Sequence, residues 1–520
     1  MTGRQAEAGP AIARGAAAGW LQVMVAFLVA PLYTAIVLAK LPREDAGFWM
    51  VILSLGAYFN LFDLGLGPTL TRYVAFARQA GPRTGAAPLA GEAAVSAADL
   101  YATARRLYAV LAAALVAVGL AAGPPLLSHA TGLALAGTHL VAWVLFLAGS
   151  AASVLATPYQ AAVAGSGVVG VPRMMRAGAQ IAGVAAAAVA LVIGQGIVGA
   201  AAAWAAQQLA LLAAGPLVVR SYCPEILRGG RYQPAVARLL ARPSLQLAGI
   251  HLGGALILAS GPLIVAAQAG PSAVPQFVVV RQLAEAMYLL ALVPAQVSEP
   301  FISRDAAAGD VSGVTALLRR NVRYVGAVLA VGAPVVAVLG REVITAWVGA
   351  ANFAGYAALW LMVALYVLEA HHVLHAATIM ATGRVVFLVP ALLSGVATIG
   401  LGIALGHRWG VAGVVAGMFA AQLLTNNWYA PWYALRQLAL RTGEYARWLS
   451  PLVPLAAVTA VLAAATRQVV RSVGPVTPAT VLCALVALGA AVLPLLWYAA
   501  LTTDERRAVG RAWRRAEVES

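Results

Sequence analysis

Lysine is almost missing from this chain: Lys40 is the only one among 520 residues, and Ala39 precedes it. A nucleotide-binding P-loop needs Gly-Lys followed by Ser or Thr, so the sequence holds no ATPase site of that kind. HExxH, paired CxxC and GxSxG patterns are also missing. We therefore expect neither a primary pump nor an enzyme, and no cofactor beyond a coupling H⁺ or Na⁺.

Cysteine is equally scarce, with Cys223 and Cys483 as the only two. Cys223 falls in a predicted cytoplasmic loop and Cys483 in the last predicted membrane span. Because the two thiols would lie in different environments, the sequence implies no disulfide framework.

Charged residues make up only 10% of the chain, whereas 62% of it is hydrophobic. Soluble domains average about 25% charged residues, so this composition predicts an all-α polytopic membrane protein. Apolar blocks of about 20 residues, enough to cross about 30 Å of hydrocarbon, recur along the chain. We expect about fourteen transmembrane helices, over 16–39, 47–70, 106–128, 138–162, 175–195, 197–219, 244–267, 275–300, 323–346, 354–381, 385–405, 410–434, 450–466 and 478–501.

The net charge of +16 could indicate a nucleic-acid partner. However, when the N-terminus is placed in the cytoplasm, most Lys and Arg residues fall in the predicted cytoplasmic segments, as the positive-inside rule requires. The arginines therefore set the orientation and contact anionic membrane lipids. We expect a multi-pass protein of a bacterial inner membrane, with both termini cytoplasmic and no nucleic-acid partner.

The spans predict a domain order with an internal repeat. The expected parts are an N-lobe (1–219), an Arg-rich cytoplasmic linker (220–243), a C-lobe (244–435), a two-helix appendage (436–503) and a basic cytoplasmic tail (504–520). Residues of the two lobes correspond in four pairs: Pro68 with Pro300, Arg72 with Arg304, Gly199 with Gly413 and Gln208 with Gln422. An even number of spans in each lobe gives a parallel repeat, which is typical of transporters.

The second predicted span carries the most specific pattern. It begins with EDAGFW at 44–49 and ends with DLGLGP at 63–68, ahead of Arg72 and Tyr73, and the twelfth span opens with GVAG at 410–413. These segments resemble Wzx-type polysaccharide flippases of the MOP (multidrug/oligosaccharidyl-lipid/polysaccharide) exporter superfamily. That superfamily also contains the lipid II flippase and the MATE multidrug exporters.

The resemblance implies two pseudo-symmetric six-helix lobes around a central cationic cavity, with two extra C-terminal helices. It implies translocation of a polyprenyl-pyrophosphate-linked oligosaccharide from the cytoplasmic to the outer leaflet by alternating access, coupled to an ion gradient. The substrate would be an undecaprenyl-pyrophosphate-linked glycan for O-antigen, lipopolysaccharide or exopolysaccharide biosynthesis. A polysaccharide polymerase and a chain-length regulator are the expected partners.

Arg281 and Glu285 lie in the eighth predicted span, four residues apart on one helix face. They could neutralise each other between helices. Alternatively, Arg281 lines the cavity and binds an anionic head group through its planar fork, with Glu285 tuning it or carrying a proton. We favour the second interpretation because no other cation is expected so deep in the membrane.

Asp63 lies in the cytoplasmic third of the second span, where a carboxylate is costly. It could bond a neighbouring helix, or it could serve as a coupling-ion site or a gate. Arg72 and Arg304 are expected at the cytoplasmic mouth, where they set topology or admit pyrophosphate.

Further polar residues are predicted inside other spans. Glu369 and His372 form a candidate protonatable cluster in the tenth span, and a metal site there is less favoured than helix packing. His251 faces the cavity or packs between helices, and Glu299 is a gate or a helix-end residue. Two other functions remain open: a MATE-type cation-coupled exporter and a membrane polysaccharide polymerase or ligase, against which the short external loops argue.

Overall fold

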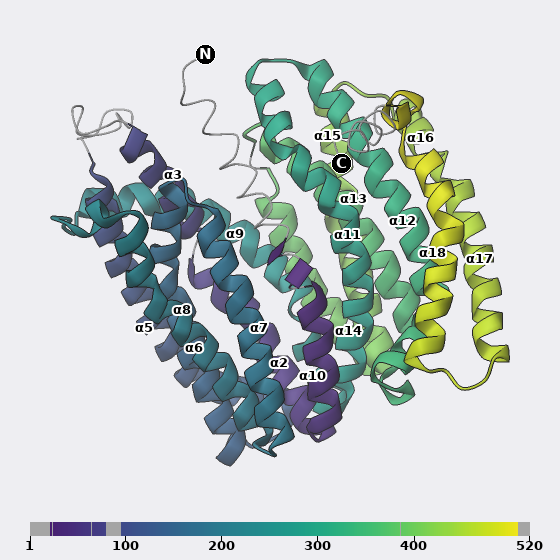
Figure 1. The fold of residues 1–520 in the computed structure, drawn as a ribbon, viewed down its shortest axis with the longest axis horizontal. Helices are drawn as coiled ribbons and strands as arrows, with labels where there is room; N and C mark the ends of the chain where they lie inside the picture. Colours follow the sequence, from purple (N-terminus) through teal and green to yellow (C-terminus); the bar gives the residue numbers. More distant parts are fainter. Residues whose placement is uncertain are drawn as a thin grey trace, which may run out of the picture. The chain divides into compact units, whose positions relative to one another are not determined.

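The computed structural model describes residues 21, 22, 24, 25, 27–63, 65–79, 95–384 and 386–507, without the side chains of residues 60, 62, 79 and 242–247. Every secondary-structure element that these residues form is helical (Figure 1). The start of the first predicted span, residues 80–94 and the tail beyond residue 507 lie outside the described residues.

Within the described ranges, eleven helices are long and apolar enough to cross a membrane, which makes the chain a multi-pass membrane protein. A shorter apolar helix covers Phe27–Lys40. The number of about fourteen spans remains a prediction, because several predicted spans are broken or merged in the structure.

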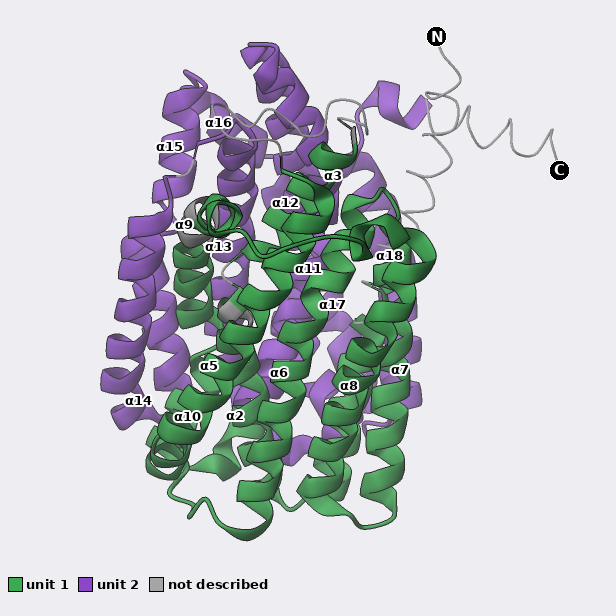
Figure 2. Ribbon diagram, turned by 90° about the vertical axis from the view of Figure 1, so that its left-hand side faces the viewer, with its two compact units in different colours: residues 1–275 green, residues 276–520 purple. Residues whose placement is uncertain are grey.

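The chain divides into two compact units, residues 1–275 and 276–520 (Figure 2). The predicted lobe boundaries at 219 and 244 remain a prediction. The predicted linker itself contains structure, since η2 (Pro224–Leu227) and the start of α9 (Pro234–Leu258) fall inside it.

Unit 1 is built around four long helices that lie side by side in Figure 1. They are α5 (Ala97–Thr131), α6 (Gly137–Gly165), α7 (Gly170–Val192) and α8 (Gly196–Tyr222). Small residues allow α6 and α8 to approach closely: a Cβ on Gly149 would lie only 2.9 Å from the indole nitrogen of Trp204. Trp204 stacks on Phe146, with ring centroids 5.6 Å apart.

The predicted second span is broken, as its Gly/Pro content indicated. Helix α2 (Arg43–Phe59) passes into the 3₁₀ turn η1 (Asn60–Asp63), and α3 (Leu66–Gln79) follows. Gly65 between them has φ +69°, a left-handed conformation that glycine adopts without steric cost. The predicted seventh span is broken too, because α9 ends at Leu258 and α10 (Gly261–Ala269) begins with Pro262 in its first turn. The turn η3 (Pro271–Ala273) then packs against α2.

Unit 2 begins with three long helices and a small turn, followed by a helical hairpin, two short helices and two further helices of membrane-spanning length. They are α11 (Val274–Ala307), α12 (Val311–Val348), η4 (Ala350–Asn352), α13 (Tyr356–Ala381), α14 (Leu388–Thr425), α15 (Tyr429–Gln437), α16 (Thr442–Leu449), α17 (Leu452–Ser472) and α18 (Pro478–Ala500). Helices α17 and α18 pack on α12, and a buried cluster of Leu339, Ala463, Leu488 and Val492 joins the three.

Two residue pairs matched by the repeat occupy comparable places in their own units. The chain reverses within α14 at Trp409 and Gly410, the latter with φ +55°, which agrees with the predicted boundary between 385–405 and 410–434. A Cβ on Gly413 would lie 2.1 Å from the carbonyl oxygen of Leu405, so the two arms touch backbone to backbone. Gly199 likewise follows the turn between α7 and α8 and lies against Ala190. Gln208 and Gln422 are both buried.

Candidate functional site

A cavity of about 780 Å³ lies within unit 1. Side chains of α6, α7 and α8 form most of its wall, and α3, α9 and Gln22 complete it. Its polar lining residues are Gln22, Asp63, Thr71, Ser153, Thr157, Gln160, Arg173, Arg176, Gln180, Gln207, Gln208 and His251. So many polar groups in the interior of a membrane protein indicate a hydrated functional site rather than packing alone.

Asp63 reaches this cavity because the helix is broken at η1. The backbone N–H of Gly67 donates a hydrogen bond to Asp63 Oδ2 over 3.3 Å, so the carboxylate closes the first turn of α3. The hydroxyl of Tyr108, on α5, donates to Asp63 Oδ1. The predicted bonding role to a neighbouring helix is therefore present, and the carboxylate also lines the cavity.

The first turns of α7 supply the positive charge. Arg173, Arg176 and Gln180 line the cavity from one face of this helix, at i, i+3 and i+7. The guanidinium of Arg176 donates from Nε to Gln160 Oε1 over 2.6 Å. Arg176 also lies within electrostatic reach of the Asp63 carboxylate, as does His251 of α9. Arg173 and Arg176 thus share the cavity with one carboxylate, and the lining is cationic even without a charge on His251.

Amide side chains line the other wall. Gln207 packs against Gly183 of α7, where a Cβ would lie 1.9 Å from the Gln207 amide oxygen, so only glycine leaves room for this amide. Gln208, on the same turn of α8, is buried. The hydroxyl of Thr157 is bonded to the Ser153 carbonyl over 3.2 Å. The wall therefore offers amide donors and acceptors beside the guanidinium groups.

A second group of predicted residues comes together within unit 2. Arg281 Nε lies 3.8 Å from Glu285 Oε2, a loose ion pair within α11. Tyr366 of α13 interacts electrostatically with both residues and with Glu369, and its ring lies 5.4 Å from that of Tyr288. The predicted pairing of Arg281 with Glu285 is present, whereas a role in substrate binding remains a prediction.

Glu369 and His372 are both buried within unit 2. Glu369 Oε2 has no hydrogen-bond partner among the described residues. His372 lies with Nδ1 3.2 Å from the Asn426 carbonyl oxygen and Nε2 3.3 Å from the Asn426 amide nitrogen. No cluster in the described part of the chain has the His, Cys, Asp and Glu side chains that a metal ion would need.

Three predicted residues lie on exposed surface. Arg72 is an exposed residue of α3, with its guanidinium 5.4 Å from the centre of the Phe76 ring. Arg304 is 70% exposed and pairs with the adjacent Asp305 at 2.9 Å. Glu299 is exposed near the end of α11. None of the three is among the residues lining the cavity of unit 1.

The prediction from sequence did not include Arg173, Arg176, Gln160 and Gln180 among the candidate site residues. A usable signal was present, because residues 173, 176 and 180 form a polar stripe on an otherwise apolar helix. The stripe does not stand out in the sequence, because Arg173 and Arg176 lie at the helix start, where the positive-inside rule already explains arginines.

No protein-family model matches this sequence, and no curated protein matches it at a significant level. Solved structures with a similar fold include three transporters. The lipid II flippase MurJ, in an inward closed conformation, has a TM-score of 0.66 at 11% identity, covering 91% of this chain and 96% of that one. An inward-facing multidrug resistance MATE family transporter of the MOP superfamily has a TM-score of 0.62 at 14% identity, covering 81% and 98%.

The third is a MOP superfamily transporter from Pyrococcus furiosus, with a TM-score of 0.55 at 16% identity, covering 82% of this chain and 95% of that one. At these identities the likeness concerns the fold. The chain therefore has the fold of MOP superfamily transporters.

Proposed function

We propose that this protein translocates a polyprenyl-pyrophosphate-linked oligosaccharide from the cytoplasmic to the outer leaflet of a bacterial inner membrane. The substrate would be an undecaprenyl-pyrophosphate-linked glycan destined for a cell-surface polysaccharide, as in Wzx-type flippases. The observation that carries the proposal is the cavity of unit 1, which Arg173 and Arg176 line together with one carboxylate and several glutamines.

This lining matches the two polar parts of such a substrate. A pyrophosphate and several sugars cannot cross hydrocarbon unaided, because each unsatisfied polar group costs several kcal/mol. Arginine binds two phosphate oxygens at once through its planar fork. The amides of Gln180 and Gln207 can both donate to and accept from sugar hydroxyls. In this proposal Arg176 and Arg173 hold the pyrophosphate and the amides hold the first sugars.

Transport would proceed by alternating access with an ion gradient as the driving force. Two buried or cavity-lining carboxylates are candidates for the coupling H⁺ or Na⁺. Asp63 lies beside the arginines of the cavity and is in electrostatic reach of Arg176. Glu369 is buried in unit 2 with one carboxylate oxygen that has no described partner. Protonation of either group would remove a charge that is costly within the membrane.

A second candidate is a MATE-type exporter of cationic compounds, favoured by Asp63 in the cavity and by the similarity to MATE structures. Pocket polarity separates the two candidates. The description of the Pyrococcus furiosus structure itself states that reverse polarity of its binding pocket suggests a different function. Two arginines against one carboxylate favour an anionic substrate over a cationic one.

The test is loss of this protein in its own host. We expect undecaprenyl-linked oligosaccharide to accumulate on the cytoplasmic face, and the intact gene to restore export. Normal glycan export combined with hypersensitivity to cationic drugs would overturn the flippase proposal and support the exporter.

A further inference from the structure

A second cavity, of about 830 Å³, lies within unit 2 and shares no residue with the cavity of unit 1. It is formed by the first turns of α12, by α16 and by the segment that follows α18. Its lining residues with charged side chains are Arg319, Arg320, Arg323, Glu444 and Glu505. Its volume falls within the range of small-molecule sites, roughly 300–1,000 Å³.

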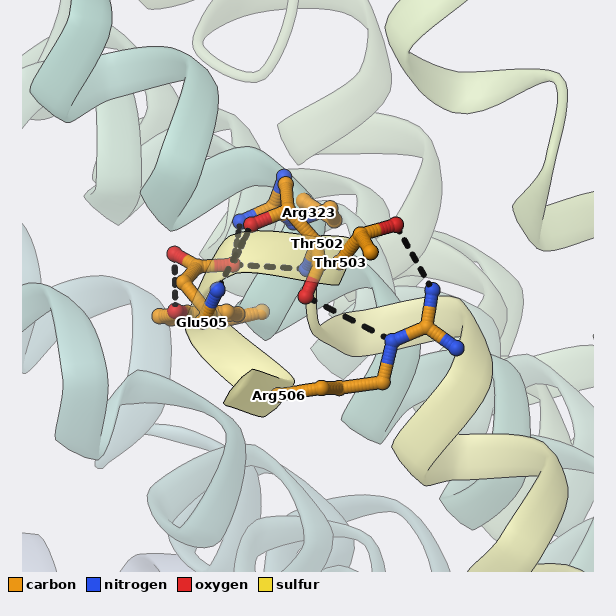
Figure 3. A network of polar contacts seen from close by, with 6 residues as sticks. Arg323, Thr502, Thr503, Glu505 and Arg506 are labelled. Atoms are coloured by element: carbon orange, nitrogen blue, oxygen red, sulfur yellow. Dashed lines mark hydrogen bonds and ion pairs between the residues drawn. The ribbon is translucent and has the colours of Figure 1, made fainter. Parts of the chain in front are cut away.

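One of the arginines is already neutralised. Arg323 pairs with Glu505 at 2.7 Å, and the same carboxylate accepts hydrogen bonds from the Tyr324 hydroxyl and from the backbone and side chain of Thr502 (Figure 3). Partial burial opposes ionisation of Glu505, but these hydrogen bonds and the Arg323 charge hold the pKa of its carboxyl below the usual value. Glu505 is thus fully engaged and fixes the segment after α18 against α12.

The other two arginines keep their charge available. Arg319 and Arg320 form no ion pair with any described residue. The guanidinium of Arg319 lies 5.8 Å from the centre of the Trp448 ring, a cation–π contact that holds it at the cavity wall. Against them stands Glu444 alone, so the unpaired lining charge is positive.

The rest of the lining is amphipathic. Thr315 and Ser312 add hydroxyls on the same helix, about one and two turns before Arg319. Trp448, Leu438 and Val311 add apolar surface beside them. Charged donors next to a tryptophan are typical of the membrane interface, where a lipid head group meets its acyl chains.

We propose that this cavity binds the phosphate of an anionic phospholipid head group. Basic pockets between transmembrane helices are a general way to hold such phosphates. Arg319 and Arg320 would bind the phosphate oxygens, with Thr315 as a further donor. The bound head group would bridge α12 and α16, and so join the start of the predicted appendage to the preceding helices of its unit.

The experiment uses the full chain in detergent, titrated with phosphatidylglycerol and separately with phosphatidylcholine, with retained lipid counted by native mass spectrometry. We expect retention of phosphatidylglycerol but not of phosphatidylcholine. The double variant R319Q/R320Q should bind phosphatidylglycerol about 25-fold more weakly, which corresponds to about 2 kcal/mol for two basic side chains. Arg447→Gln, on α16 but outside the lining, is the matched control and should bind normally.

Glu444→Gln provides a test that a folding defect cannot imitate. Removing this competing carboxylate should strengthen phosphatidylglycerol binding, since the lining loses its unpaired negative charge. Inorganic phosphate alone should leave the mass spectrum and the thermal stability unchanged. If inorganic phosphate binds with the same dependence on Arg319, the ligand is a free anion and the lipid assignment is overturned. Equal lipid retention by R319Q/R320Q and the intact protein would overturn the site.

Discussion

The backbone N–H of Gly67 donates a hydrogen bond to Asp63 Oδ2 over 3.3 Å, and this bond links the end of η1 to the first turn of α3. The close approach depends on the missing side chain. A Cβ on Gly67 would lie 3.1 Å from Thr157 Cγ2 and 3.3 Å from Asp63 Oδ1, both tighter than ordinary contacts.

Gly67→Ala should therefore displace the Asp63 carboxylate from the cavity and destabilise the protein by about 1 kcal/mol, the lower end for overpacking. Glycan export in complemented cells and thermal stability in detergent measure the two effects. Gly178→Ala on α7 is the control, because its Cβ would meet nothing within 4 Å. Full export by Gly67→Ala would contradict a functional role for the Asp63 position.

Arg176 and Arg72 make a matched comparison of a cavity-lining arginine with an exposed one. Arg176→Gln removes a charged donor from the cavity, and loss of such a hydrogen bond costs about 1.5–3 kcal/mol, or about 10- to 150-fold in transport. Arg72→Gln removes an exposed charge and should reduce transport little. The rate of glycan export at equal protein levels distinguishes the two variants. A larger loss of export for Arg72→Gln would contradict a head-group site at Arg176 and would support the one predicted at the cytoplasmic mouth.

Glu342 fixes α17 to α12 in unit 2. The Glu342 side chain is 4% exposed and accepts hydrogen bonds from Arg467 and Arg471, each over 3.0 Å. Glu342→Gln should destabilise the protein by about 2 kcal/mol, less than a fully buried pair because both arginines are partly exposed. Thermal unfolding measures this loss. Asp305→Asn breaks an exposed pair with Arg304 and should change stability little.

Asp310 gives a pH dependence outside the membrane spans. Its side chain accepts hydrogen bonds from Ser312 and from the backbone N–H of Gly313, at the start of α12, and these hold the pKa of the carboxyl below its usual value. A lowered pKa in the folded state contributes stability above the unfolded value of about 3.9, and this contribution is lost as the pH falls through the folded value.

Asp310→Ala should therefore lower the melting temperature at pH 7, and the difference from the intact protein should shrink as the pH falls below about 4. Asp310→Asn keeps a good capping side chain without a titratable group. Its melting temperature should lie closer to that of the intact protein at pH 7. A deficit for Asp310→Ala that stays constant down to pH 3 would show that the ionised carboxylate contributes nothing.

The sequence predicted those features that depend on local composition. Apolar blocks must cross the membrane as helices, because no water in the bilayer satisfies backbone groups. Gly65, Gly67 and Pro68 predicted the break in the second span, since left-handed and proline-containing backbone interrupts a helix. Gly199 and Gly413, which the predicted repeat pairs, each lie where two arms of a hairpin approach closely.

The candidate site was predicted only in part. Asp63 and His251 were identified as rare polar residues inside spans, and both line the cavity. Arg72, Arg304 and Glu299 looked equally suitable in the sequence but lie on exposed surface. Arg173 and Arg176 looked like topological arginines, and only their position in the wall of the cavity that Asp63 also lines distinguishes them from the others.

The sequence by itself thus determined that this chain is a multi-pass helical membrane protein without an ATPase motif, and that its second span is interrupted. Only the tertiary structure decided which polar side chains share a cavity. The physical reason is that a span's hydropathy reports how much of a helix is apolar, whereas a site depends on which faces of α3, α6, α7, α8 and α9 meet. Contacts such as those of Gly183 with Gln207 and of Gly67 with Asp63 determine which helix faces pack together. No local sequence pattern reveals these partners.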